Sequence, residues 1–123
     1  MRINNISMQT AATDMTASFN LPAIWLGHVC NFSVQVVFTG TPVGSFKLQA
    51  SNDAGSPNAS TQPLLATGVT NWTDIANSAQ AVSAAGDITW NYANAGFNFV
   101  RLVYTASSST GSLTVARLNT KGV

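Results

Sequence analysis

Residues 31–51 read NFSVQVVFTGTPVGSFKLQAS, and they hold two runs of alternating side chains on either side of a compact turn. Successive side chains of a β-strand point to opposite faces, so alternation of this kind predicts two half-buried strands. The glycines and proline of residues 40–44 suit a tight turn. We therefore expect the two strands to pair as a β-hairpin. Their apolar faces hold Phe32, Val34, Val36, Phe38, Phe46, Leu48 and Ala50.

The rest of the chain also favours strands. No long window repeats apolar residues at intervals of three and four, so we expect no helix. The segment 97–105 (FNFVRLVYT) is largely apolar on both faces, which predicts a central strand. Pro22 interrupts an early segment, which predicts an edge or a bulge there. The other expected strands are residues 17–26, 72–75, 87–92 and 112–119, the last of them closing the sheet.

A chain of 123 residues is the length of one domain. About seven to eight short strands separated by turns predict an all-β fold, an antiparallel β-sandwich of the jelly-roll kind. A closed barrel is the alternative. We expect the sandwich to occupy residues 17–123, preceded by an N-terminal arm, residues 1–16, that is a candidate interface segment. The long loop expected over residues 52–68 is a second candidate interface.

The composition limits the classes of partner. Charged residues make up only 7 % of the chain, against about 25 % in an average protein, and there is no Glu. A freely soluble monomer normally covers its surface with charge. We therefore favour a surface that packs against copies of itself or other proteins, with a rigid extracellular β-protein as the alternative. The net charge of +1 and the scattered cations argue against a nucleic-acid partner.

The chain carries no sign of a membrane segment. No apolar run approaches the roughly 20 residues that span a bilayer, and the first ten residues lack the apolar region of a signal peptide. We expect no membrane partner and assembly in the cytoplasm. Cys30 is the single cysteine, so an intramolecular disulfide is excluded, and we expect it to be a small buried apolar residue.

The residues that carry acid–base or metal chemistry are few. Paired carboxylates, or a carboxylate with a histidine, are the usual requirement for general acid–base catalysis. His28 is the single histidine, and no serine lies in a nucleophile elbow, so we expect no catalytic residue. Neither a cofactor nor a metal ion is expected, although a calcium-like oxygen cage at Asn52 and Asp53 is an alternative to turn capping by Asp53. The acids are Asp14, Asp53, Asp74 and Asp87.

Arg101 lies inside the apolar strand 97–105. A buried arginine needs a partner for its charge. Asp53 and Asp74 lie at strand ends in the middle of the chain, so we expect Arg101 to pair with one of them.

Three tryptophans each have an apolar neighbour next to them or two positions away, which favours a place in the core or an interface. The alternative is a flat platform on which sugar rings stack, and Trp90 with Tyr92 and loop residues is the candidate for it. The tryptophans are Trp25, Trp72 and Trp90.

Three short motifs follow one another in a familiar order: LQASND at residues 48–53, WTDI at 72–75 and FVRL at 99–102. This order resembles the discoidin, or coagulation factor 5/8 type C-like, sandwich over roughly residues 46–104. The chain departs from that pattern because it is shorter, and because a long loop replaces the Asp-Gly that usually precedes the tryptophan.

A wider pattern is similar to small structural proteins of tailed-phage particles. It adds FTGTPVG at residues 38–44, VRLVYT at 100–105, the Ser/Thr–Gly turn 107–111 and the Lys-Gly at 121–122. The resemblance implies a non-enzymatic component of a phage particle, located on the head, collar, tail or fibre. Its implied partners are itself and other virion proteins. The alternative function is a carbohydrate-binding or host-adhesion module with a host glycan as its ligand, and an enzyme comes third.

Overall fold

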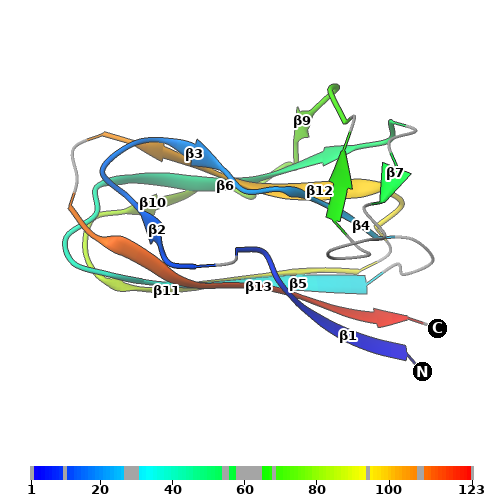
Figure 1. The fold of residues 1–123 in the computed structure, drawn as a ribbon, viewed down its shortest axis with the longest axis horizontal. Helices are drawn as coiled ribbons and strands as arrows, with labels where there is room; N and C mark the ends of the chain where they lie inside the picture. The colour runs from blue at the N-terminus through cyan, green and yellow to red at the C-terminus, as the bar shows by residue number, and fades with distance from the viewer. Residues whose placement is uncertain are drawn as a thin grey trace.

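The computed structural model describes residues 2–9, 11–26, 31–53, 56–57, 65–67, 69–93, 95–107 and 110–122. Within these ranges there are thirteen strands and no helix (Figure 1). Accordingly, the described residues include no helix long and apolar enough to cross a membrane. The strands are β1 (Arg2–Ser7), β2 (Thr13–Asp14), β3 (Phe19–Asn20), β4 (Ala23–Trp25), β5 (Asn31–Thr39), β6 (Gly44–Ser51), β7 (Ser56–Pro57), β8 (Leu65–Thr67), β9 (Thr73–Asp74), β10 (Gln80–Val82), β11 (Gly86–Tyr92), β12 (Phe99–Ala106) and β13 (Ser112–Gly122).

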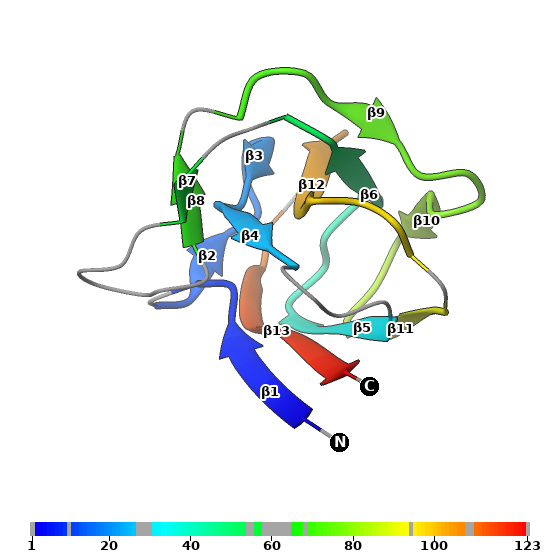
Figure 2. The ribbon, with the colours of Figure 1, turned by 90° about the vertical axis from the view of Figure 1, so that its right-hand side faces the viewer.

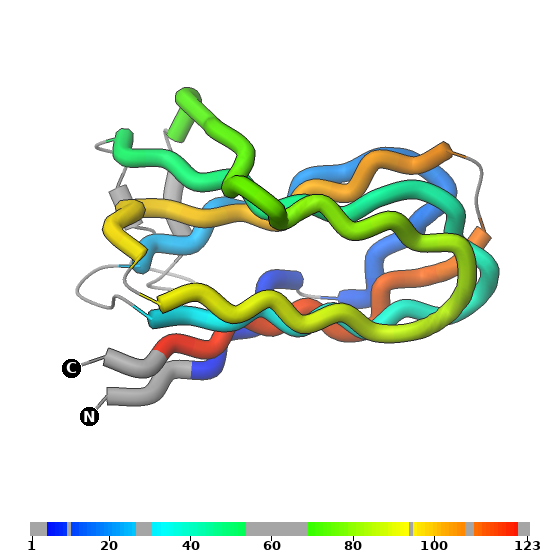
Figure 3. The backbone as a smooth tube through the Cα atoms, turned by 180° about the vertical axis from the view of Figure 1, so that it is seen from behind, coloured from blue at the N-terminus to red at the C-terminus, as the bar shows by residue number. Residues whose placement is uncertain are grey.

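The strands form two antiparallel sheets packed face to face. Sheet A has the order β1-β13-β5-β11, with β2 beside β13. Sheet B has the order β10-β6-β12-β4-β8-β7, with β3 beside β12 and β9 beside β6. Figures 2 and 3 show the two layers with the interior between them. The predicted antiparallel sandwich is thus confirmed, in place of the closed barrel. Many of the additional strands are pieces of two or three residues.

The predicted hairpin between β5 and β6 is wrong. β5 pairs with β11 and β13 in sheet A, whereas β6 pairs with β12, β10 and β9 in sheet B. The turn after β5 therefore carries the chain from one layer to the other. Phe38 and Phe46 face each other across the interior, with ring centroids 5.6 Å apart. Each strand has one apolar face, and stacking the strands in opposite layers buries both faces against each other.

Two turns meet at the end of the sandwich where this crossing occurs. Gly40 and Gly111 have positive φ values of 83° and 123°. A Cβ on Gly111 would lie 2.4 Å from the carbonyl oxygen of Thr39. The hydroxyls of Thr41 and Thr110 join the same two turns at 2.7 Å. Glycine is needed at residue 111 because both the backbone angle and the available space exclude a side chain.

Pro22 interrupts a strand, as predicted. β3 and β4 both pair with β12, one after the other, and the break between them contains Leu21 and Pro22. The N–H of Leu21 still donates to the carbonyl of Leu102 at 2.9 Å. Proline has no N–H to offer a ladder, so the pairing stops there and resumes at β4. β4 also pairs with β8, so it lies inside sheet B.

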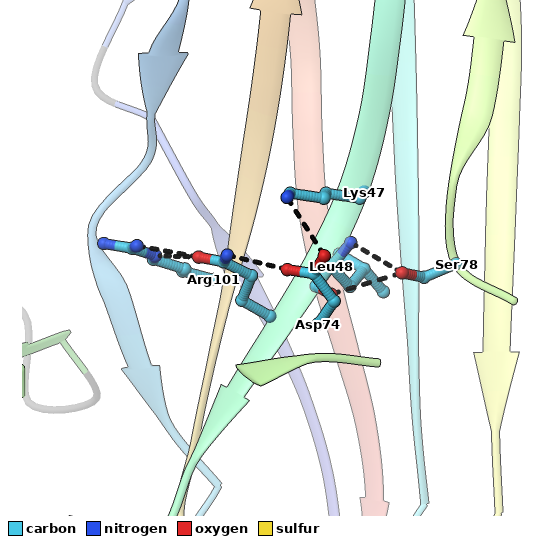
Figure 4. A network of polar contacts seen from close by, with 6 residues as sticks. Lys47, Leu48, Asp74, Ser78 and Arg101 are labelled. Atoms are coloured by element: carbon cyan, nitrogen blue, oxygen red, sulfur yellow. Dashed lines mark hydrogen bonds and ion pairs between the residues drawn. The ribbon is translucent and has the colours of Figure 1, made fainter. Parts of the chain in front are cut away.

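A second break lies on the other side of sheet B. β9 and β10 both pair with β6, and the turn between them contains Asn77 at φ 62°. Ser78 fills the gap with its side chain. Its hydroxyl accepts the N–H of Leu48 at 3.1 Å and donates to the carbonyl of Leu48 at 3.2 Å (Figure 4). The backbone of β6 therefore keeps its hydrogen bonds where the strand beside it is absent.

The N-terminal residues belong to the sandwich. β1 pairs with β13 over six residues, and β2 pairs with β13 further along. Met8 and Met15 are 1 % and 0 % exposed. The expected boundary between an arm and a domain at residue 16 is therefore not a structural boundary. β12 lies in the middle of sheet B, as predicted. We expected β13 to close the sheet, but it lies between β1 and β5 and is an inner strand of sheet A.

The expected loop over residues 52–68 contains two short strands. β7 and β8 pair with each other, and β8 attaches the segment to β4. Residues 54–55, 58–64 and 68 of this loop lie outside the described residues, and so do His28 and Cys30.

Candidate functional site

The outer face of sheet B carries a chain of polar contacts, drawn in Figure 4. The strand register places Arg101 opposite Gln49, and Gln49 opposite Asp74. Arg101 donates from Nε and Nη2 to Gln49 Oε1 at 2.9 and 2.7 Å. Gln49 Nε2 donates to Asp74 Oδ1 at 2.8 Å. Lys47 forms an ion pair with Asp74 Oδ2 at 3.1 Å.

Arg101 is also covered by an aromatic ring. Its guanidinium carbon lies 4.3 Å from the ring centroid of Trp72, a cation–π arrangement. Burial lowers the pKa of Arg101. The predicted direct pair is not formed: among the described residues, Arg101 has no ion pair and no hydrogen bond with Asp53 or Asp74. Gln49 lies between Arg101 and Asp74 in the sheet register and joins them by hydrogen bonds.

Asp53 is held by residues far along the chain. Its Oδ2 accepts the backbone N–H groups of Thr70 and Asn71 at 2.8 and 2.9 Å, and its Oδ1 accepts the Asn71 side-chain amide at 2.9 Å. The Asn71 side chain and these N–H groups lower the pKa of Asp53 to about 2. Asp53 thus joins the two ends of the segment 54–69. Asp53 was predicted to cap a turn beside it, but its carboxylate binds residues at the far end of the loop. We call this set of hydrogen bonds between Asp53 and residues 70–71 the carboxylate bracket.

A groove of about 680 Å³ lies beside this bracket. Its apolar part includes Ala50, Ile75 and Phe97, and both Asp53 and Asp74 are on its polar wall. Hydrogen bonds from Gln49 and Lys47 lower the pKa of Asp74, so both carboxylates are acceptors of hydrogen bonds at neutral pH. We call this space the Asp53 groove. It is lined by Ala50, Ser51, Asn52, Asp53, Asn71, Thr73, Asp74, Ile75, Ala76 and Phe97.

Among the described residues, no three His, Cys, Asp or Glu side chains come together as they would around a metal ion. Both carboxylates of the groove already accept hydrogen bonds from neighbouring residues. Asn71 and Thr70 donate to Asp53, and Gln49 and Lys47 donate to Asp74. The groove therefore offers hydrogen-bond acceptors and amides around an apolar floor, a set of groups suited to a hydroxyl-rich ligand.

The suggested aromatic platform is wrong for Trp90. This side chain is 5 % exposed, lies edge-on to Phe46 and donates its Nε1–H to the carbonyl of Ser78 at 2.7 Å. It lies on the inner face of β11, so it belongs to the core. Tyr92 is half-buried beside Phe32, with ring centroids 5.4 Å apart. Burial raises the pKa of Tyr92.

From the sequence we did not predict that Gln49 and Trp72 contact Arg101, or that Asn71 contacts Asp53. The alternation of β6 does place Gln49 on the same face as Lys47, which was a usable signal. No sequence signal places Asn71 beside Asp53, because the contact spans 18 residues and depends on the path of the loop.

The outer face of sheet A presents a second polar surface. The register aligns Asn91, Ser33, Asn119 and Asn5 in one row across four strands. The next row is Thr89, Gln35, Arg117 and Ser7. A shallow hollow of about 340 Å³ lies on this face. We call these two rows the amide face, because neutral amides and hydroxyls make up all but one of its side chains.

Comparison with known proteins shows a common fold. No protein-family model matches the chain, and no curated protein matches its sequence. The SPBc2 prophage-derived protein YomS superposes with a TM-score of 0.56 at 14 % identity, covering 98 % of this chain and 94 % of that one. The chain shares the β-sandwich of a prophage-derived protein.

Two other solved structures are similar at lower TM-scores. A chain of infectious bursal disease virus, Gx strain, gives 0.46 at 10 % identity, covering 97 % of this chain and 31 % of that one. The CBM22-1 and GH10 modules of Clostridium thermocellum xylanase 10B, solved with xylohexaose, give 0.43 at 16 % identity, covering 98 % and 26 %.

Proposed function

We propose that this protein is a non-enzymatic structural component of a bacteriophage particle, which works by self-association and by docking on other virion proteins. The fold supports the proposal, because the prophage-derived YomS has the same sandwich over nearly its whole length. The composition supports it as well, since a chain with 7 % charged residues has a surface suited to contact with other proteins.

The amide face is the observation that carries this proposal. Moving a charged group out of water costs several kcal/mol per ion, whereas a neutral amide can exchange its water for a partner's hydrogen bond at a much smaller cost. Ser33 and Asn119 lie in neighbouring strands at the middle of the face. Arg117 is the single charged member, and it already donates to Asn5 at 3.2 Å. The face can therefore be covered by a partner with little loss of hydration energy.

Incorporation into particles tests the proposal. Particles of the phage that encodes the chain are purified from cells producing the wild type, Ser33→Arg or Thr105→Arg, and the chain is quantified by mass spectrometry. Thr105 is the matched control because it is exposed on β12 in the opposite sheet. We expect the wild type and Thr105→Arg in the particles, and Ser33→Arg in much smaller amount. Particles that lack the wild-type chain would overturn the proposal.

The Asp53 groove favours one second candidate, a carbohydrate-binding or host-adhesion module. Its amides and carboxylates match the hydroxyl groups of a sugar, and Phe97 and Ile75 offer apolar contact to a ring face. Thr73→Arg would fill the groove, since Thr73 is exposed on its wall. On a glycan array, a signal given by the wild type and lost in Thr73→Arg supports this function. An array with no signal for the wild type removes it.

A further inference from the structure

β11 forms one edge of sheet A (Figure 3). It pairs with β5 in an uninterrupted register from Gly86 opposite Phe38 to Tyr92 opposite Phe32. Within the described ranges, no strand and no further backbone hydrogen bond covers its outer side. Seven residues of extended backbone therefore present alternate N–H and C=O groups to the surroundings.

This edge lacks the features that usually protect a free strand. Natural edges are kept from pairing by lysine, proline, a bulge or very short length. The sequence of β11, GDITWNY, has no lysine and no proline, and its register has no shift. β10, the neighbouring edge of sheet B, has only three residues and is protected by its length. Asp87 is the single charge along β11.

The strand is complementary to itself in one register. Two antiparallel copies centred on Thr89 pair all seven residues, and inner side chains meet inner ones, as the sandwich requires. The carboxylate of each Asp87 then lies opposite the amide of the other copy's Asn91, and the two negative charges are kept apart. Ile88 would lie opposite the other copy's Trp90. Ile88 and Tyr92 are half-buried at the rim of the core, so the second copy would complete their burial.

We propose that β11 is a self-docking edge, through which two copies of this chain join antiparallel about Thr89 and make one continuous sheet from their two sheets A. The two copies present the same surface to each other, as expected of a twofold interface. This inference rests on the self-association part of the proposed function, and it names the strand and the register that supply it.

Introducing a charge of either sign at Thr89, the centre of the strand, tests the register. Thr89→Lys and Thr89→Asp each place two like charges directly opposite across the twofold axis, which opposes pairing. Sedimentation velocity over a concentration series should show each variant dissociating at roughly tenfold higher concentration than the wild type. An equimolar mixture of the two variants should regain the wild-type association, because lysine then lies opposite aspartate. Thermal unfolding of each variant verifies that it is folded.

Thr105→Lys is the matched control, because Thr105 is exposed on β12 in sheet B, away from both β11 and the amide face. It should associate as the wild type does. The proposed pairing of two β11 strands is wrong if both Thr89 variants still associate as the wild type does. It is also wrong if the equimolar mixture does not regain the wild-type association. A wild-type chain that stays monomeric at every concentration would also overturn the pairing, while its presence in purified particles would leave the proposed function standing.

Discussion

Arg101 shows how a charge is kept inside a mostly apolar sheet. The sequence correctly indicated that this arginine needs a partner, and an acid is the usual expectation. Gln49 and Trp72 meet the requirement instead, one by two hydrogen bonds to its oxygen and the other with its ring. A glutamine can do this because its amide passes the contact on to Asp74, so that each group of the row has a partner.

Replacing Arg101 by methionine keeps much of the side-chain length and removes the charge. We expect the free energy of unfolding to fall by about 1–2 kcal/mol, from the lost hydrogen bonds and the lost contact with Trp72. Urea denaturation measures it. Arg117→Met is the control, because Arg117 is exposed and donates one longer bond, and it should stay within about 0.5 kcal/mol of the wild type. Equal effects of the two variants would contradict the role given to Arg101.

Asp53 is expected to make the stability of the fold depend on acid pH. Its pKa is about 2 in the folded chain, against an ordinary value of 3.8. A lowered pKa means that the carboxylate stabilises the fold above about pH 4 and that this contribution is lost as the pH falls through about 2. Asp53→Asn should therefore lower the thermal midpoint most at neutral pH. The gap to the wild type should narrow as the solution is acidified toward pH 2.

Thermal unfolding at a series of pH values measures this gap. Asp87→Asn is the control, since Asp87 is exposed and makes no hydrogen bond to the described residues. Its difference from the wild type should stay small throughout. A gap for Asp53→Asn that is constant across the series would show that the carboxylate bracket does not stabilise the fold.

At the scale of elements, the crossing between β5 and β6 distinguishes this sandwich from the hairpin that its sequence suggests. Two alternating strands joined by a short turn satisfy local chemistry equally well whether they pair edge to edge or stack face to face. The choice is made by β13 and β11, which take both edges of β5, and by β12, which takes an edge of β6. These partners come from the second half of the chain, so no local pattern contains the answer.

The glycine turns at this crossing make a testable element. Gly111→Ala should lower the free energy of unfolding by more than about 1 kcal/mol, because its φ is 123° and its Cβ would meet the Thr39 carbonyl. Gly96→Ala is a matched control, since a Cβ there has no neighbour within 4 Å. It should leave stability unchanged or slightly raised. Chemical denaturation measures the free energy of unfolding of both variants. Similar losses in Gly111→Ala and Gly96→Ala would refute the strain expected at residue 111.

For the whole molecule, the N-terminal segment and the C-terminal strand depend on each other. β1 and β13 run side by side, and Met8 and Met15 reach the common core (Figure 1). Weak patterning suggested an N-terminal arm outside the sandwich, but an edge strand needs only one buried face and a few anchoring residues.

Deleting residues 1–16 should therefore abolish cooperative unfolding, measured by circular dichroism during heating. Point variants of Met15 measure how much one buried side chain of this segment contributes to the free energy of unfolding. Met15→Ala should cost about 2–5 kcal/mol by leaving a cavity, and Met15→Leu, which keeps the volume, less than about 1.5 kcal/mol. A truncated chain that unfolds as cooperatively as the full one would restore the view of these residues as an arm.

The sequence by itself determined the layer architecture, the strands β5, β6, β11, β12 and β13, and the break at Pro22, because alternation, turn residues and proline chemistry act locally. It also indicated that Arg101 and Asp53 needed partners. Only the tertiary structure decided which strands pair, that Trp90 is core, and that Asp53 meets Asn71. Those outcomes depend on sheet register and on contacts between distant residues, where many pairings satisfy the same local pattern and the packing of the whole core selects one.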